Sequence, residues 1–220
     1  MTARVDAREM IDGPVDSLAE LEGNLRDIAR ANRLFGGIGP VARELARLAP
    51  ESILDVGCGL ADVPRALARR IAGARIVCLD SSEQILELAR RHSRGSSALE
   101  FVRGEATELP FEDEAFDVVT CSLTLHHLAP PAARALLAEM RRVAKRLPVV
   151  CDLRRSRTAY AATWLYTRLF TRNRLTRHDG PLSVLRAYTP GEALRLAREA
   201  GWRAPHVRSE PWFRMTLTDG

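Results

Sequence analysis

The segment 53–62 (ILDVGCGLAD) carries the residue types best suited to holding a small ligand. Gly57 and Gly59 stand between a predicted buried strand and a predicted helix, where the backbone can turn sharply and approach a ligand closely. The free N–H groups and the dipole of the helix face the same point. Asp55 ends the strand, and its carboxylate favours a cationic ligand with an ammonium group over a pyrophosphate. Position 62 holds Asp62 where the dinucleotide fingerprint requires glycine, which disfavours NAD.

The elements that position this segment alternate along the chain. Apolar periodicity predicts strands at 52–56, 75–79, 99–103, 116–123 and 147–153, with helices between them at 63–71, 83–92 and 132–145. Helices at 18–35 and 40–49 come first. After the fifth strand we expect an apolar helix at 159–170, a basic polar loop to about residue 183, a helix at 191–200, and strands at 203–209 and 213–218. This order predicts an α/β fold whose mainly parallel sheet is covered on both faces and binds its ligand at the carboxyl ends of the strands.

Several motifs in this order resemble those of the class I S-adenosylmethionine (SAM)-dependent methyltransferases, in particular bacterial small-molecule enzymes of the ubiquinone and menaquinone biosynthesis type. LDVGCGLAD resembles the first motif of that family, and Asp80 ends the second strand. The stretches 104–111 (GEATELPF) and 116–128 (FDVVTCSLTLHHL) resemble the next two motifs. The resemblance implies a Rossmann-like fold with a seven-stranded sheet, and SAM as the cofactor.

The resemblance also implies which residues bind SAM. Asp80 is expected to accept hydrogen bonds from the ribose hydroxyls, and Glu105 to lie beside the adenine. The full implied set is Asp55, Gly57, Cys58, Gly59, Asp80, Ser81, Glu105, Ala106, Cys121 and Ser122. Arg33 is added from its charge alone, as a partner for the SAM carboxylate.

One domain over residues 1–220 is the expected organisation. It comprises an N-terminal helical lid (1–49), a SAM-binding core (50–153), an acceptor-site insertion after the fifth strand (154–189), and a C-terminal helix with strands (190–220). The insertion includes the aromatic helix at 159–170, for which two interpretations stay open. The helix walls an apolar acceptor pocket, which we favour, or it simply packs on the sheet.

The histidines are the candidates for acid–base chemistry. A phenol or enol acceptor must lose a proton, and a histidine near its ordinary pKa can remove it. His126 and His178 are the candidate bases, while packing is the favoured role for His127. Asp152, at the end of the fifth strand, is expected to contact the acceptor or to orient a histidine. We expect methylation of a phenolic or enolic oxygen of a secondary metabolite. C-methylation of a quinone-type precursor and a non-catalytic SAM-binding module stay open.

Composition limits the partners. The formal charge is +5, but Lys145 is the only lysine and the arginines are scattered, which disfavours a nucleic-acid surface. No stretch of 18 apolar residues and no CxxC spacing is present, so we expect a cytoplasmic protein with reduced cysteines, no transmembrane segment and no metal site. The expected partner is an aromatic or apolar small molecule, and a homodimer stays open.

Overall fold

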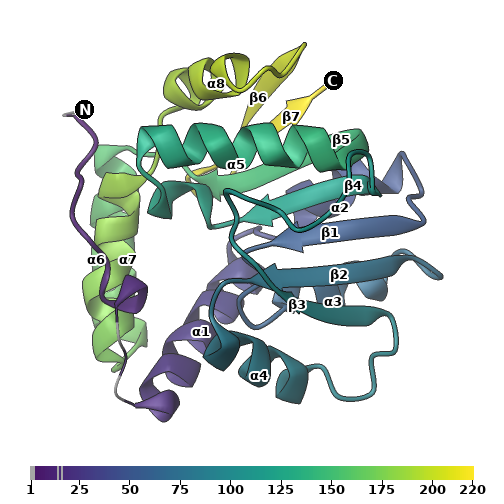
Figure 1. Ribbon diagram of the computed structural model, residues 1–220. Coiled ribbons are helices and arrows are strands. Elements are labelled where there is room, and N and C mark those ends of the chain that lie inside the picture. Colours follow the sequence, from purple (N-terminus) through teal and green to yellow (C-terminus); the bar gives the residue numbers. More distant parts are fainter. Residues whose placement is uncertain (1–2, 14, 16) are drawn as a thin grey trace.

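The sheet is the framework of the molecule. The computed structural model describes residues 3–13, 15 and 17–220. In this part of the chain seven strands form one sheet in the order β3-β2-β1-β4-β5-β7-β6, in which β7 is antiparallel to both of its neighbours (Figure 1). The strands are β1 (Ser52–Val56), β2 (Arg75–Asp80), β3 (Leu99–Arg103), β4 (Phe116–Ser122), β5 (Ala144–Leu153), β6 (Pro205–Glu210) and β7 (Arg214–Asp219). The predicted mainly parallel, seven-stranded α/β fold is confirmed.

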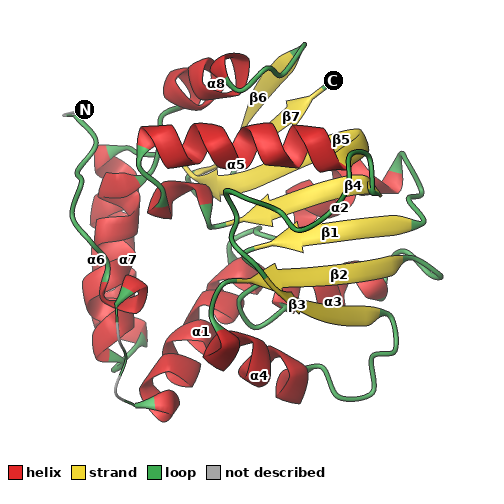
Figure 2. Cartoon of the chain, in the orientation of Figure 1, coloured by secondary structure: helices red, strands yellow, loops and turns green. Residues whose placement is uncertain are grey.

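Helices cover both faces of the sheet (Figure 2). One core cluster joins β1, β4 and β7 to α5 (Pro130–Val143) and α8 (Pro190–Glu199). The other joins the opposite sheet face to α2 (Gly39–Ala46), α3 (Asp62–Ala68) and α4 (Glu83–His92). Strand residues alternate between the clusters, as Leu54 and Ile53 do, because successive side chains point to opposite faces. The remaining helices are α1 (Leu18–Leu34), α6 (Arg157–Phe170) and α7 (Arg174–Arg186), with short 3-10 turns at Met10–Asp12 and Leu125–His127.

The predicted polar loop up to about residue 183 is wrong, because α7 occupies this segment. Asn173 caps the helix by accepting a hydrogen bond from the Thr176 amide at 3.1 Å. Thr176 also ties α7 to α1: its hydroxyl accepts from Asn24 Nδ2 at 3.1 Å and donates to Asp27 Oδ2 at 3.0 Å. This contact with a distant helix stabilises a segment whose own pattern is not amphipathic.

The boundary between the helix that follows the fourth strand and the fifth strand also differs from the prediction. The helix ends at Val143 rather than Lys145, and β5 begins at once at Ala144. Pro148 therefore lies inside a strand. It precedes the residues of β5 that pair with β7, which start at Val149, so it interrupts no hydrogen bond of that ladder.

Residues 3–13 run along α7 as an extended segment, which we call the strap (Figure 1). The Arg4 guanidinium donates to the carbonyls of Arg186 at 2.6 Å and of His126 and Leu128 at 2.9 Å each. Four residues of the predicted lid (1, 2, 14 and 16) lie outside the described part of the chain. No helix among the described residues is long and apolar enough to cross a membrane.

Candidate active site

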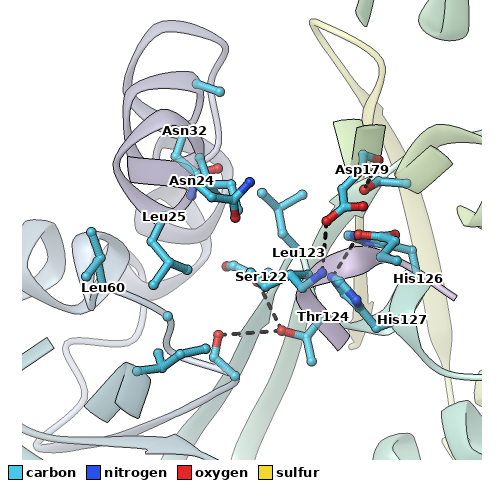
Figure 3. Close-up of a pocket in the computed structure, with 18 of the residues that line it drawn as sticks. Asn24, Leu25, Asn32, Leu60, Ser122, Leu123, Thr124, His126, His127 and Asp179 are labelled. Carbon is cyan, nitrogen blue, oxygen red and sulfur yellow. Dashed lines mark hydrogen bonds and ion pairs between the residues drawn. The ribbon is translucent and has the colours of Figure 1, made fainter. Parts of the chain in front are cut away.

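A cavity of about 810 Å³ lies at the carboxyl ends of the parallel strands. This volume is within the range of about 300–1,000 Å³ that is typical of small-molecule and cofactor sites. The loops that follow β1, β2 and β4 line one half of it, and α1, α6, α7 and the strap line the other half. Figure 3 shows Asn24 and Leu25 of α1 facing Ser122, the last residue of β4, and Leu123 and Thr124, which follow it. The cavity is therefore where the fold class predicts a ligand.

The loop after β1 is a backbone cradle. Gly57 and Gly59 have φ of +72° and +53°, values that favour glycine. The amides of Gly57 and Cys58 both donate to the Leu79 carbonyl, at 2.8 and 2.9 Å, which fixes the loop to β2. A Cβ at Gly57 would overlap the Thr124 side chain. Ala61, at the N-cap of α3, adopts φ +54° without being glycine, so the departure from the family pattern at this position retains the left-handed backbone.

Two carboxyl groups flank the cradle. Asp55 is buried and accepts a hydrogen bond from the Thr120 hydroxyl at 2.6 Å. Burial raises the pKa of Asp55 to about 7. Asp80 accepts hydrogen bonds from the amides of Gly59 at 3.2 Å and Ser82 at 3.1 Å, and burial raises its pKa as well. Both groups line the cavity and can bind ammonium or hydroxyl groups of a ligand.

His126 and Asp152 form a buried pair at the edge of the cavity. His126 Nδ1 lies 2.6 Å from Asp152 Oδ1, and the His126 amide donates to Asp152 Oδ2 at 3.2 Å. Against the effect of burial, the charge and hydrogen bond of His126 and two backbone amides hold the pKa of Asp152 below its usual range. An ionised Asp152 favours the tautomer with the proton on Nδ1, so Nε2 is left able to accept a proton.

Glu9, in the strap, faces both histidines and was not identified from the sequence. It is 3% exposed, with its two carboxylate oxygens 3.9 Å from His126 Nε2 and 3.8 Å from His127 Nε2. Burial raises the pKa of Glu9 to about 7, although His127 and Arg186 oppose that rise. Glu9 Oε1 has no hydrogen-bond partner among the described residues. No motif surrounds Glu9 in the sequence, so only the path of the strap brings it here.

His127 belongs to the same cluster. Its Nδ1 lies 2.7 Å from Asp12 Oδ1, while Arg186 Nη1 lies 2.6 Å from Asp12 Oδ2. Hydrogen bonds and charges of both partners lower the pKa of Asp12 against the effect of burial. The packing role predicted for His127 is therefore incomplete, because its ring joins a polar network as well as lining the cavity.

Glu9, His126 and His127 also offer three potential metal ligand atoms within 4.8 Å of one another. A tetrahedral zinc site would bring such atoms to roughly 3.4 Å from each other. Arg186 Nη1 lies 3.7 Å from Glu9 Oε1 and already supplies positive charge at this position. The absence of a metal site stays a prediction.

The structure brings most of the predicted site residues together. Those that line the cavity are Asp55, Gly57, Cys58, Gly59, Asp80, Ser81, Glu105, Ala106, Ser122 and His126. Asp152 stands behind His126, so it orients the histidine and does not line the cavity. Their roles toward a bound ligand stay predictions.

Three predicted residues lie elsewhere. Cys121 is fully buried in the sheet, because its side chain points into the core that faces α5. Arg33 is exposed and does not line the cavity, so its position does not support the predicted contact with a SAM carboxylate. His178 is half-exposed on α7 and pairs with Asp179 at 2.7 Å, and only Asp179 of the two faces the cavity. Arg214, which sequence reasoning missed, does line it.

The aromatic helix matches neither sequence interpretation fully. α6 packs on α7 and not on the sheet, and of its four aromatic residues only Tyr166 lines the cavity. Tyr166 meets Phe35 edge-on, with ring centroids 5.0 Å apart, and Phe35 lies 5.4 Å from Trp212. These rings form an apolar part of the cavity wall.

Comparisons with known proteins agree with this geometry. Residues 53–146 match a family described as a methyltransferase domain. The demethylmenaquinone methyltransferase of Thermotoga maritima is 32% identical over 177 residues, which are 74% of this chain and 74% of that protein. The chain belongs to the class I SAM-dependent methyltransferase family. SAM is therefore its cofactor, and the glycine cradle with its two acids has the donors and acceptors to hold it.

Other relatives of this methyltransferase match over a shorter span. The demethylmenaquinone methyltransferase of Clavibacter sepedonicus is 43% identical over 103 residues, 47% of this chain and 40% of that protein. The ubiquinone biosynthesis O-methyltransferase of Hahella chejuensis is 40% identical over 104 residues, 46% of this chain and 42% of that protein. These matches span less than half of each relative. Human N-acetylserotonin methyltransferase in complex with SAM shares the fold, with a TM-score of 0.70 at 16% identity, covering 97% of this chain and 62% of that one.

Proposed function

We propose that this methyltransferase transfers the SAM methyl group to the oxygen of a phenolic or enolic small molecule. The observation that carries the proposal is the His126–Asp152 pair, whose nitrogen and oxygen lie 2.6 Å apart at the edge of the cavity. SAM supplies an activated methyl group, so the chain has to orient the acceptor and take up its proton.

The SAM half of the cavity is the cradle after β1 with Asp55 and Asp80. Asp55, when ionised, attracts the ammonium group, and Asp80 accepts hydrogen bonds from the ribose. Glu105 and Ala106, after β3, line the same half at the position expected for the adenine. Together these residues would hold the cofactor beside the acceptor half of the cavity.

The acceptor half is formed by residues of α1, α6, α7 and the strap. Phe35, Tyr166 and Ile28 provide apolar and aromatic surface, which suits an aromatic acceptor. This placement supports the predicted acceptor role of the insertion at 154–189. Asp179 lines this half of the cavity. Its carboxylate accepts hydrogen bonds from the amides of Met10 at 2.8 Å and Ile11 at 3.0 Å, so it anchors the strap.

The proton of the acceptor hydroxyl moves to His126 Nε2 as the oxygen–carbon bond forms and the sulfur–carbon bond breaks. The products are a methyl ether and S-adenosylhomocysteine, and the proton is then released from the histidine. Asp152 is a positioning residue, because it holds Nδ1 and stabilises the imidazolium ion. Glu9, beside Nε2, is placed to receive the proton next.

The test uses labelled SAM and a panel of phenolic and enolic acceptors, with S-adenosylhomocysteine as the product measured. We expect His126→Ala and Asp152→Asn to lower kcat by about 10²- to 10⁴-fold, the usual contribution of a general base. The affinity for SAM, measured by calorimetry, should stay unchanged. His178→Ala is the matched control and should keep full turnover, since His178 lies outside the cavity. Normal turnover in His126→Ala would exclude the proposed base.

C-methylation of a quinone-type precursor is the second candidate, and the names of the two demethylmenaquinone methyltransferase relatives favour it. The same base can deprotonate a ring hydroxyl and so raise the nucleophilicity of a ring carbon. The NMR spectrum of the product separates the two candidates, because a methoxy and a ring methyl group resonate at different shifts. SAM binding without S-adenosylhomocysteine from any acceptor would instead identify a non-catalytic SAM-binding module.

A further inference from the structure

Apolar side chains gather on the exposed side of α6 and beside it, a surface we call the α6 patch. Leu169 and Phe170 are 66% and 65% exposed, and Trp212, in the turn between β6 and β7, is 60% exposed. Rings connect these positions: Phe170 stacks on Tyr166 at 5.3 Å, and Phe35 bridges Tyr166 and Trp212. The patch comprises Leu34, Tyr160, Trp164, Leu165, Leu169, Phe170 and Trp212. Exposed apolar surfaces of this kind mark interaction sites.

The charge on α6 and on the residues that follow it to 174 has one sign, although Glu20 of α1 pairs with Arg174 at 3.1 Å. Residues 157–174 contain four arginines and no acidic residue. Arg157, Arg168 and Arg172 are exposed and form no ion pair with a described residue. The Arg168 guanidinium lies 5.6 Å from the centre of the Trp164 ring, so a cation stands directly on the apolar surface. Tryptophan, tyrosine and leucine beside arginine form the combination that binds the headgroup region of an anionic membrane.

The patch meets the rim of the cavity. Ala162 of α6 and Trp212 both line the cavity and are exposed, so they stand where its interior reaches the surface. Tyr166 lines the interior between them and stacks on Phe170 of the patch. The patch and the apolar wall of the acceptor half are therefore joined through Tyr166 and Trp212.

We infer that the α6 patch docks this protein on the surface of an anionic lipid bilayer. α6 and α7 form one side of the molecule (Figure 1). Leucine and aromatic side chains enter the headgroup region, and the arginines pair with lipid phosphates. A further step, which rests on the proposed function, is that the acceptor is lipid-soluble and enters across the rim at Ala162 and Trp212.

The docking test needs neither SAM nor an acceptor. The full chain is sedimented with vesicles of phosphatidylcholine containing phosphatidylglycerol, and with vesicles of phosphatidylcholine alone. We expect binding to the anionic vesicles that weakens as salt is raised, because salt screens the arginine–phosphate attraction. The double variant Leu165→Ser/Leu169→Ser should bind at least about tenfold more weakly, since it removes two leucines from the contact.

Leu18→Ser is the matched control, because Leu18 is 42% exposed but lies at the start of α1, outside the patch. It should bind vesicles like the unchanged chain, and circular dichroism should show all variants folded. Failure of the unchanged chain to bind anionic vesicles at low salt overturns the inference, as does an equal loss in Leu18→Ser. A dimer in solution that the double variant abolishes would assign the patch to a second copy of this chain.

The acceptor step has its own readout. Adding anionic vesicles should lower the KM for a long-tailed phenol and leave the KM for a short phenol unchanged. Vesicle binding without methylation of any acceptor would overturn the proposed function and leave the docking inference standing. Methylation without vesicle binding would overturn the docking inference and leave the proposed function standing.

Discussion

At the scale of single residues, burial is what makes the carboxyl groups of this site reactive. Asp55 and Glu9 are both more than nine-tenths inaccessible to solvent, and burial raises the pKa of each to about 7. Asp152 is equally buried, but the hydrogen bond and charge of His126 keep it ionised. Two kinds of carboxyl group thus serve one site: Asp55 and Glu9, which line the cavity and have pKa values of about 7, and Asp152, which stays ionised behind His126.

The raised pKa of Asp55 predicts that SAM binding depends on pH. If the ionised carboxylate binds the ammonium group, affinity should rise with pH through about 7, and be roughly tenfold weaker at pH 6 than at pH 8. Calorimetric titration with SAM across this range measures the effect. Asp55→Asn should bind weakly at every pH, and Glu9→Gln should keep the dependence. An unchanged pH dependence in Asp55→Asn would show that another group titrates.

At the scale of elements, the loops and the strap position more of the site residues than the strands do. The loop between β1 and α3 has a left-handed backbone at Gly57, Gly59 and Ala61, and its amides at Gly57 and Cys58 tie it to the Leu79 carbonyl of β2. The strap, which has no regular structure apart from one short turn, brings Glu9 and Asp12 to the two histidines. Arg4 holds the strap against α7 through backbone carbonyls.

Gly57→Ala tests the glycine loop. The new methyl group would overlap Thr124 and adopt a positive φ, so we expect a loss of about 2–4 kcal/mol in stability and at least tenfold in SAM affinity. Gly73→Ala is the control, because Gly73 also has a positive φ, +84°, but open space around it. It should cost only about 1 kcal/mol and leave SAM binding intact. Urea unfolding and calorimetry give both quantities, and equal effects of the two changes would exclude the steric explanation.

At the scale of the whole molecule, proton binding by the carboxyl groups of the site is coupled to the stability of the fold. Asp55 and Glu9 have pKa values near 7 when folded and near 4 when unfolded, so the folded protein without SAM holds protons that the unfolded chain has released. The free energy of unfolding should therefore fall as pH rises from about 5 to 8. Asp12 and Asp152, with lowered pKa values, contribute stability that is lost only at pH below about 4.

Urea unfolding midpoints at pH 5, 6, 7 and 8 measure this coupling. We expect the midpoint to fall with pH in the unchanged chain and to vary much less in Asp55→Asn/Glu9→Gln, which cannot bind the two protons. A slope that persists in the double variant would assign the effect to other groups. Saturating SAM should raise the midpoint most at pH 8, where Asp55 is ionised and free to pair with it.

The sequence by itself determined the alternation of strands and helices, the glycine loop and the two carboxyl groups, Asp55 and Asp80, that line the cavity. These features are local: apolar periodicity, Gly57 and Gly59 between strand and helix, and the acids near the ends of β1 and β2 can all be identified within a few residues. The parallel order and the position of the cavity followed from them, because carboxyl ends of parallel strands meet at one edge.

Only the tertiary structure decided which groups meet. The sequence offered His126 and His178, with Asp152 as a possible partner, and the fold paired His126 with Asp152 at the edge of the cavity and His178 with Asp179 on α7. α7, Glu9 and the α6 patch were likewise not predictable, because each depends on contacts with segments distant in the chain. A hydrogen bond or a buried charge needs atoms within a few ångströms, and the spacing of residues along a chain does not fix that distance.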